Sequence, residues 1–197
     1  MNEQRVAVVT GAGTGIGRAS ATALAAAGFD LVLAGRRPEP LSETQTAVEA
    51  VGRRARSVVT DVGESDQVDA LFDVVESDFG RVDLLFNNAG SGTPPVPMDE
   101  LDVDAWHRVV GANLTGSFLC ARRAMGLMKR QDPRGGRIIK LPDLYYPVAD
   151  HGDIGDVGRS ARPVDQRATP DYQVVVRTRR RGAGSERHQP PNENTKA

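Results

Sequence analysis

The sequence predicts an α/β protein built on a doubly wound parallel sheet. Short apolar runs of strand type alternate with stretches in which apolar residues recur at helical spacing. This alternation favours parallel strands joined by helices that cover both faces of the sheet. Glycine, asparagine and aspartate motifs also follow the strand ends, where the ligand crevice of an open parallel sheet lies.

Each element of this fold has an expected place in the chain. Strands are expected at residues 6–9, 29–34, 56–60 and 82–86, and a fifth strand is expected to begin at residues 137–139. The helices are expected at residues 16–27, 41–51, 68–79 and 103–129. The predicted core residues lie in the strand runs or on inner helix stripes: Val6, Val8, Ile16, Leu24, Leu31, Leu33, Val58, Leu71, Phe72, Val75, Leu84, Phe86 and Leu114. Two stripes are expected to face inward, Ile16, Ala19, Ala23, Leu24 and Ala27 in the first helix and Trp106, Val110, Leu114, Phe118, Ala121, Met125 and Met128 in the fourth.

A glycine-rich turn with the pattern T-G-x-x-x-G-x-G joins the first strand to the first helix. Such a turn leaves the first helical N–H groups unpaired, and together with the positive end of the helix dipole they suit a pyrophosphate. The glycines permit the tight turn, the close approach of the ligand and the close packing of helix on strand. The predicted cofactor-binding residues of this turn are Thr10, Gly11, Gly13, Thr14, Gly15, Ile16 and Gly17.

The end of the second strand indicates the choice of cofactor. An NAD-preferring site has an acidic residue there, which binds the ribose 2′-hydroxyl. This sequence has Gly35 at that point, followed by Arg36 and Arg37. A guanidinium pairs with phosphate through charge-assisted hydrogen bonds. We therefore predict a preference for NADP(H) over NAD(H), with Arg36 as the direct contact and Arg37 either stacked on the adenine or facing solvent.

Two further motifs follow strand ends. Asp61 and Val62 come after the third strand, and Asn88, Ala89 and Gly90 come after the fourth. Because the carboxyl ends of parallel strands meet at one edge of the sheet, we expect both motifs to lie beside the glycine turn.

The bulk properties exclude several classes of protein. A net charge of −1 does not indicate a nucleic-acid or membrane partner, and the chain has no apolar run of about 18 residues. We expect no signal peptide before Val6 and no metal site. The single cysteine, Cys120, fits a reducing cytoplasm, and within an apolar helix pattern it is expected to be a small buried hydrophobe.

The regular pattern stops near Lys140. Residues 140–197 are rich in proline and arginine, and only Val174–Val176 has the composition of a strand core. We expect a dinucleotide-binding domain over residues 1–139 and a disordered tail over residues 140–197, because too little apolar surface is available to offset ordering. The basic run at residues 177–181 is interpreted as solvated rather than as a nucleic-acid site.

Together these motifs resemble the short-chain dehydrogenase/reductase family. The resemblance rests on the family's cofactor turn, adenine-contacting pair, strand-four motif and fourth-helix motif, which match residues 10–17, 61–62, 87–90 and 102–118. It covers residues 5–139 and implies a Rossmann-like fold, truncated here after about the fifth strand. It also implies hydride transfer between a nicotinamide cofactor and an alcohol or carbonyl substrate, by a protein that is usually homo-oligomeric.

The same resemblance implies a set of catalytic residues. In the family a Tyr is the general acid and base, a Lys four residues later lowers its pKa, a Ser orients the substrate oxygen, and an Asn holds a proton-relay water. Only the Asn has a counterpart here, Asn113, whose alternative interpretation is a polar residue on a solvent-facing turn. No Tyr-x-x-x-Lys occurs, and Pro142 to Tyr146 stand where the Ser is expected.

These departures leave three hypotheses. The chain is an oxidoreductase by descent that is inactive as written, a non-catalytic NADP(H)-binding module, or a non-functional truncated product. The abrupt change after Ile139 suggests a changed reading frame, with a truncated or degenerate gene as the rival explanation. A Tyr-x-x-x-Lys in another frame of the coding DNA from codon 140 would support the frame change.

Overall fold

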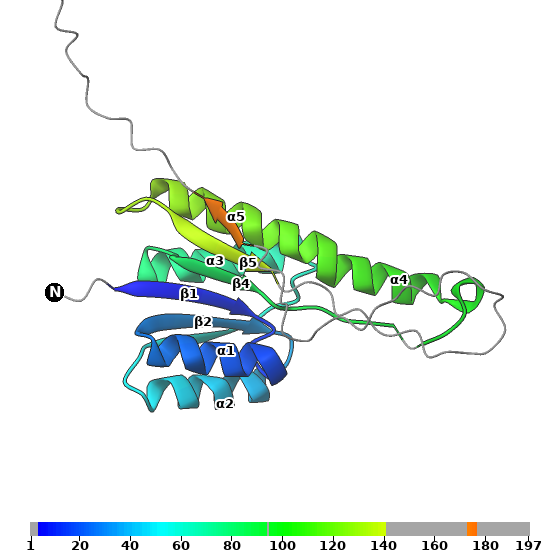
Figure 1. The fold of residues 1–197 in the computed structure, drawn as a ribbon, viewed down its shortest axis with the longest axis horizontal. Helices are drawn as coiled ribbons and strands as arrows, with labels where there is room; N and C mark the ends of the chain where they lie inside the picture. Colours follow the sequence, from blue (N-terminus) through cyan, green and yellow to red (C-terminus); the bar gives the residue numbers. More distant parts are fainter. Residues whose placement is uncertain (1–3, 94, 141–172, 177–197) are drawn as a thin grey trace, which may run out of the picture.

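A computed structural model describes residues 4–93, 95–140 and 173–176, which form a six-stranded sheet in the order β3-β2-β1-β4-β5-β6 (Figure 1). The strands are β1 (Arg5–Thr10), β2 (Phe29–Gly35), β3 (Ala55–Val59), β4 (Leu84–Asn87), β5 (Gly136–Lys140) and β6 (Gln173–Val176). The helices are α1 (Gly15–Ala26), α2 (Pro38–Glu49), α3 (Ser65–Phe79), α4 (Val103–Val110) and α5 (Gly116–Arg130), with a short 3₁₀ turn at Met98–Glu100 and a π-helical turn at Gly111–Thr115.

The first five strands are parallel, which confirms the predicted doubly wound α/β, Rossmann-like sheet. The chain starts in the middle of the sheet, with Val8 of β1 paired to Val32 of β2 on one side and to Leu85 of β4 on the other. It runs outward through β2 and β3 and then crosses back to β4 and β5. The order therefore reverses between β1 and β4, and this switch point is where open α/β sheets bind ligands.

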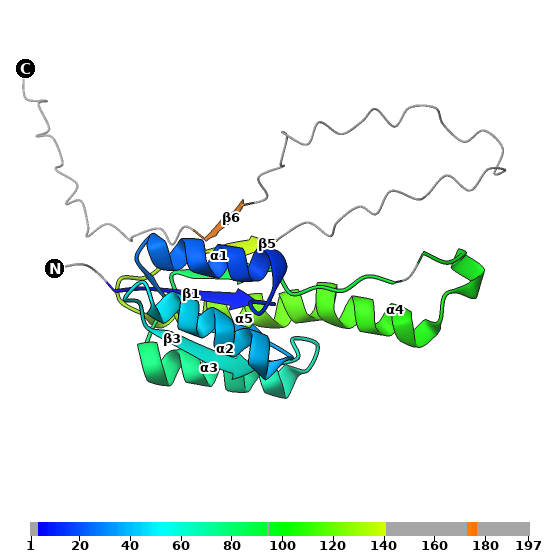
Figure 2. The same cartoon turned by 90° about the horizontal axis from the view of Figure 1, so that it is seen from below.

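Two apolar layers sandwich the sheet. Helices α1 and α2 cover one face and helices α3 and α5 cover the other (Figure 2). Most predicted core residues are buried: Val6, Val8, Leu31, Leu33, Leu71, Phe72, Val75, Leu84 and Phe86. Leu24 and Val58 are partly buried and pack against these layers.

The inner stripe of α1 was predicted wrongly except at Leu24, which packs against the core. Ile16 is 50% exposed, whereas the residues that face the sheet are Gly17, Ala21 and Ala25. Small side chains let the helix axis approach the strands, so the buried face is not the face with the largest apolar residue. Ala19, Ala23 and Ala27, which were expected to face inward, are exposed as well.

The fourth predicted helix is interrupted, and part of its predicted inner face is exposed. A π-helical turn at Gly111–Thr115 separates α4 from α5, and Trp106, Leu114 and Phe118 are each more than half exposed. The wider turn changes which residues of the helix face the sheet, and α4 projects beyond the sheet (Figures 1 and 2). The face that packs on the sheet is formed by Cys120, Ala124, Leu127 and Met128 of α5.

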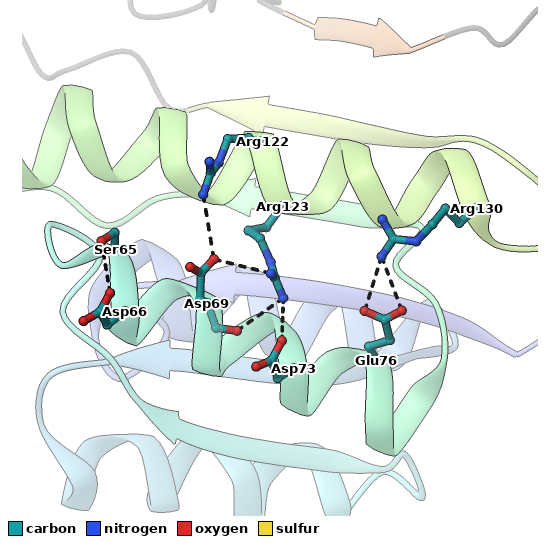
Figure 3. A network of polar contacts seen from close by, with 8 residues as sticks. All are labelled: Ser65, Asp66, Asp69, Asp73, Glu76, Arg122, Arg123 and Arg130. Carbon is teal, nitrogen blue, oxygen red and sulfur yellow. Dashed lines mark hydrogen bonds and ion pairs between the residues drawn. The ribbon is translucent and has the colours of Figure 1, made fainter.

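Helices α3 and α5 are also joined by ion pairs along their outer edge (Figure 3). Arg123 contacts Asp73 at 2.6 Å and Asp69 at 3.4 Å, and Arg130 contacts Glu76 at 3.3 Å. Pairs this exposed contribute about 0–1 kcal/mol each. The apolar layer beneath them therefore holds the helices together, and the charges mainly set their alignment.

The turn between α5 and β5 depends on one buried amide. Gln131 accepts a hydrogen bond from the N–H of Val82 at 2.9 Å, and it donates to the carbonyls of Val82 at 3.1 Å and Gly135 at 2.9 Å. We expect Gln131→Ala to lower the free energy of unfolding by about 1–3 kcal/mol, because it leaves these buried groups unpaired. Urea denaturation measures this, with the exposed Lys129→Ala as control; equal stability of the two variants would contradict it.

Strand β6 pairs antiparallel with β5, with Val174 opposite Ile138. The sequence had singled out Val174–Val176 as strand-like. Of the tail predicted at residues 140–197, Lys140 ends β5 and Gln173–Val176 form β6. The other residues of this tail fall outside the described residues, and their disorder and the domain boundary at residue 139 stay predictions. Within the described part of the chain, no helix is long and apolar enough to span a membrane.

Candidate functional site

A cleft of about 960 Å³ opens at the carboxyl ends of the parallel strands. It is bordered by the glycine turn, the loops after β2, β3 and β4, and the junction of α4 with α5. All but two of the predicted site residues line it: Gly11, Gly13, Thr14, Ile16, Gly17, Arg36, Arg37, Asp61, Val62, Asn88, Ala89, Gly90 and Asn113. The loops that the sequence predicted to converge thus do meet at one edge of the sheet.

The two exceptions, Thr10 and Gly15, support the turn instead. Thr10 is buried, and its hydroxyl oxygen accepts hydrogen bonds from the N–H groups of Asn88 at 3.0 Å and Ala89 at 2.9 Å. It therefore ties the end of β1 to the loop after β4. Gly15 begins α1 with a φ of +53°, a left-handed conformation that favours glycine.

Close approach of α1 to β1 explains Gly17. A Cβ atom at this position would collide with the carbonyl oxygen of Gly11 and would lie 2.6 Å from Nδ2 of Asn88. The Asn88 amide in turn donates to the carbonyls of Thr10 at 2.8 Å and Gly11 at 3.3 Å. The turn therefore has a shape that only glycine permits at position 17.

The end of β2 presents positive charge to the cleft. Arg36 and Arg37 are exposed, line the cleft, and make no hydrogen bond or ion pair with the residues that the structure describes. Arg37 is the residue that precedes α2, and Gly35 occupies the place where a carboxylate would repel a phosphate. Both guanidinium groups are therefore available to an anion.

The wall after β3 is held by hydrogen bonds between its backbone and nearby side chains. A carboxylate oxygen of Asp61 accepts from the N–H of Gly63 at 3.0 Å, and the N–H of Asp61 donates to Gln67 at 2.7 Å. Val62 is buried against Gly116, where an added Cβ would lie 2.6 Å from Cγ2 of Val62. Gly116 thus sets how closely α5 approaches this wall.

Asn113 lies in the π-helical turn between α4 and α5, and it lines the cleft together with the loop after β4. Its Oδ1 accepts from the N–H of Ser91 at 2.8 Å, and its Nδ2 donates to the carbonyl of Ser91 at 3.0 Å. The side chain is half-buried and does not simply face solvent. π-Helical turns often occur at functional sites, and this one presents Asn113 to the loop after β4.

Sequence reasoning missed some of these contributors. Ser91 and Gly116 act through contacts that no local pattern indicates. Lys140 also lines the cleft, and its place at the end of β5, paired with Asn87, is a signal that could have identified it. Cys120 is buried as expected, and burial raises the pKa of its thiol to about 12. The described residues contain no cluster of side chains suited to a metal ion.

A parallel sheet with a cleft at its switch point and a glycine turn before the first helix defines a Rossmann-like α/β protein. This chain belongs to the short-chain dehydrogenase family, whose sequence profile, described as short chain dehydrogenase, matches residues 5–142.

Characterised relatives agree with this assignment. The chain is 45% identical over 145 residues to cis-4-hydroxycyclohexanecarboxylate dehydrogenase of Sinomonas cyclohexanicum, which covers 74% of this chain and 57% of the relative. The crystal structure of a metagenomic short-chain oxidoreductase in complex with NADP is 36% identical, with a TM-score of 0.68 and coverage of 74% and 66%. NAD⁺-bound xylitol dehydrogenase is 35% identical, with a TM-score of 0.66 and coverage of 71% and 54%. The chain spans about half to two thirds of the length of such relatives.

Proposed function

We propose that this chain is, by descent, an NADP(H)-dependent oxidoreductase whose described part is the cofactor-binding portion. The observation that supports this most directly is the pair Arg36 and Arg37, which line the cleft at the end of β2 without a partner among the described residues. The neighbouring Gly35 offers no carboxylate for a ribose 2′-hydroxyl. One solved relative is in complex with NADP and another is bound to NAD⁺. We therefore propose that the residues at the end of β2 decide which of the two cofactors this chain prefers.

The cleft also fits the remainder of such a cofactor. The glycine turn provides the first N–H groups of α1, which suit a pyrophosphate. The adenine would lie against Asp61 and Val62, and the loop formed by Asn88, Ala89 and Gly90 would border the nicotinamide half. A bound nicotinamide cofactor supplies the hydride, and the substrate we propose is a small alcohol or carbonyl compound.

The proton chemistry is the incomplete part of this proposal. We propose that Asn113, which lines the cleft, holds a relay water there, as its counterpart in the family does. The sequence contains no Tyr-x-x-x-Lys, and directly after β5, where the family has its Ser, it has Pro142 to Tyr146 instead. A phenol with a pKa near 10 needs a neighbouring cation before it acts as a base at neutral pH. We therefore propose that this chain binds cofactor without turnover.

This missing group favours a second candidate, a non-catalytic NADP(H)-binding module. Titration with NADPH, combined with a carbonyl-reduction assay, separates the two candidates, since only an oxidoreductase oxidises the bound cofactor. The third hypothesis, a product that does not fold stably, predicts no cooperative thermal transition.

A single cysteine fits the proposed cytoplasmic location, and homo-oligomerisation is proposed from the family.

We expect Arg36→Ala to weaken NADPH binding by about tenfold or more, because a hydrogen bond to a charged group is worth about 1.5–3 kcal/mol. NADH binding should stay unchanged, since NADH lacks the 2′-phosphate. Gly35→Asp should shift the preference towards NADH. Isothermal titration of both cofactors against the wild type and each variant measures this, and equal or tighter NADH binding by the wild type would overturn the assignment.

A further inference from the structure

We infer that Arg18 and Thr44 are positioning residues that set the direction of the cofactor turn's N–H groups from behind. The inference rests on the proposed cofactor binding and names two side chains outside the motif that build the pyrophosphate site. In a planar trans peptide, the C=O of one residue and the N–H of the next point in opposite directions. A side chain that holds a carbonyl oxygen therefore also directs the following N–H.

The carbonyl oxygens of the turn all have protein donors. Those of Thr10 and Gly11 accept from the Asn88 amide. The carbonyl of Ala12 accepts from the Thr44 hydroxyl at 3.1 Å, and the carbonyl of Gly13 accepts from Nε of Arg18 at 2.9 Å. A carbonyl turned into the cleft would repel a phosphate, and these bonds hold each one in place.

Two of these bonds act on residues that line the cleft. The Thr44 bond to Ala12 directs the N–H of Gly13, and the Arg18 bond to Gly13 directs the N–H of Thr14. Gly13 and Thr14 both border the cleft. Thr44 is fully buried, and its one hydroxyl proton is shared between the carbonyls of Ala12 at 3.1 Å and Pro40 at 2.9 Å, so it links the turn to the start of α2.

Arg18 further joins the turn to α2. Its Nη2 donates to Glu43 at 2.7 Å and approaches the carbonyl of Pro40 at 3.4 Å. Pro40 packs on the turn, since a Cβ at Gly13 would lie 3.0 Å from Cβ of Pro40. The planar guanidinium of Arg18 thus binds the turn through Gly13 and helix α2 through Pro40 and Glu43 at the same time. A lysine has no such planar set of donors.

The test compares the dissociation constants of NADPH and NADH for the full chain. Arg18→Ala should raise both by the same factor, about tenfold, because both cofactors contain the pyrophosphate. Arg36→Ala raises only that of NADPH, so the two effects are separable. Arg18→Lys should give a smaller rise, Thr44→Val should act like Arg18→Ala, and Thr44→Ser, which keeps the hydroxyl, should restore binding.

The matched control is Arg130→Ala, which removes an exposed arginine that pairs with Glu76 far from the cleft. It should leave both dissociation constants unchanged. Amide NMR spectra of the ligand-free chain provide a second readout, in which Arg18→Ala and Arg18→Lys should each shift the signals of Gly13 and Thr14. The inference is overturned by unchanged binding of both cofactors, by a loss confined to NADPH, or by unshifted signals in both variants. If the wild type binds neither cofactor, the proposed function fails, and the amide signals alone decide whether Arg18 positions the turn.

Discussion

Replacing Gly17 with alanine should weaken cofactor binding by at least about tenfold and destabilise the fold. The new methyl group would collide with the carbonyl oxygen of Gly11, and it would lie 2.8 Å from the carbonyl carbon of Gly11 and 2.6 Å from Nδ2 of Asn88. Two of these atoms are backbone, which cannot rotate away as a side chain can. Helix α1 must therefore move off β1, and overpacking of this kind costs about 1–3 kcal/mol, occasionally more.

For Gly17→Ala, we expect the larger effect on the affinity for NADPH and the smaller effect on the free energy of unfolding. Moving α1 displaces the first helical N–H groups that we propose for the pyrophosphate, and each hydrogen bond lost to a charged group is worth about 1.5–3 kcal/mol, or about tenfold or more in the dissociation constant. Titration with NADPH measures binding, and urea denaturation measures stability. Gly126→Ala in α5 is the control, because an added Cβ there meets only the flexible end of Arg130 at 3.4 Å.

The control also isolates the cause. Both positions lie in helices, where alanine is favoured over glycine by up to about 1 kcal/mol. Gly126→Ala should therefore be neutral or stabilising, and Gly17→Ala should be the opposite. NADPH binding by Gly17→Ala at the wild-type affinity would show that α1 does not need its close contact with β1.

Local patterns were enough to predict the sheet and the loops of the site. Strand runs such as that of β1 are apolar throughout because both of their faces are covered, and their ends are marked by glycine, aspartate or asparagine. Arg36 could be assigned to the cleft from the sequence alone, because it comes directly after the predicted end of the second strand. Because the carboxyl ends of parallel strands lie at one edge of the sheet, the motifs at these ends come together, and the place of the cleft could be predicted.

Helix faces were less predictable, because they depend on contacts across space. Ile16 is the largest apolar residue at the start of α1, yet the face that packs on β1 is the one with Gly17 and Ala21. The π-helical turn before α5 changes the face on which Leu114 lies, and periodicity alone gives no sign of it. The partner of Asn113 is a backbone group of Ser91, which no spacing rule identifies.

The chain should show no carbonyl reductase activity, even when it is saturated with NADPH. Loss of a general acid and base costs about 10²–10⁴ in rate, and in this sequence the cation that activates it and the Ser that orients the substrate are missing as well. The water that we propose for Asn113 does not replace the missing phenol, because the amide that would hold it neither donates nor accepts a proton at neutral pH.

Replacing residues 140–197 with a segment of a characterised relative that places Ser, Tyr and Lys in register after Ile139 should restore turnover. Absorbance of NADPH with a carbonyl substrate measures the rate, and the same graft with its Tyr changed to Phe is the control, because it keeps the added fold but not the phenol. Turnover by the ungrafted chain would contradict the expectation. Turnover by the graft and not by its Phe variant would show that the cleft described here is a working cofactor site, and that the segment after Ile139, with its Tyr, is what this chain lacks.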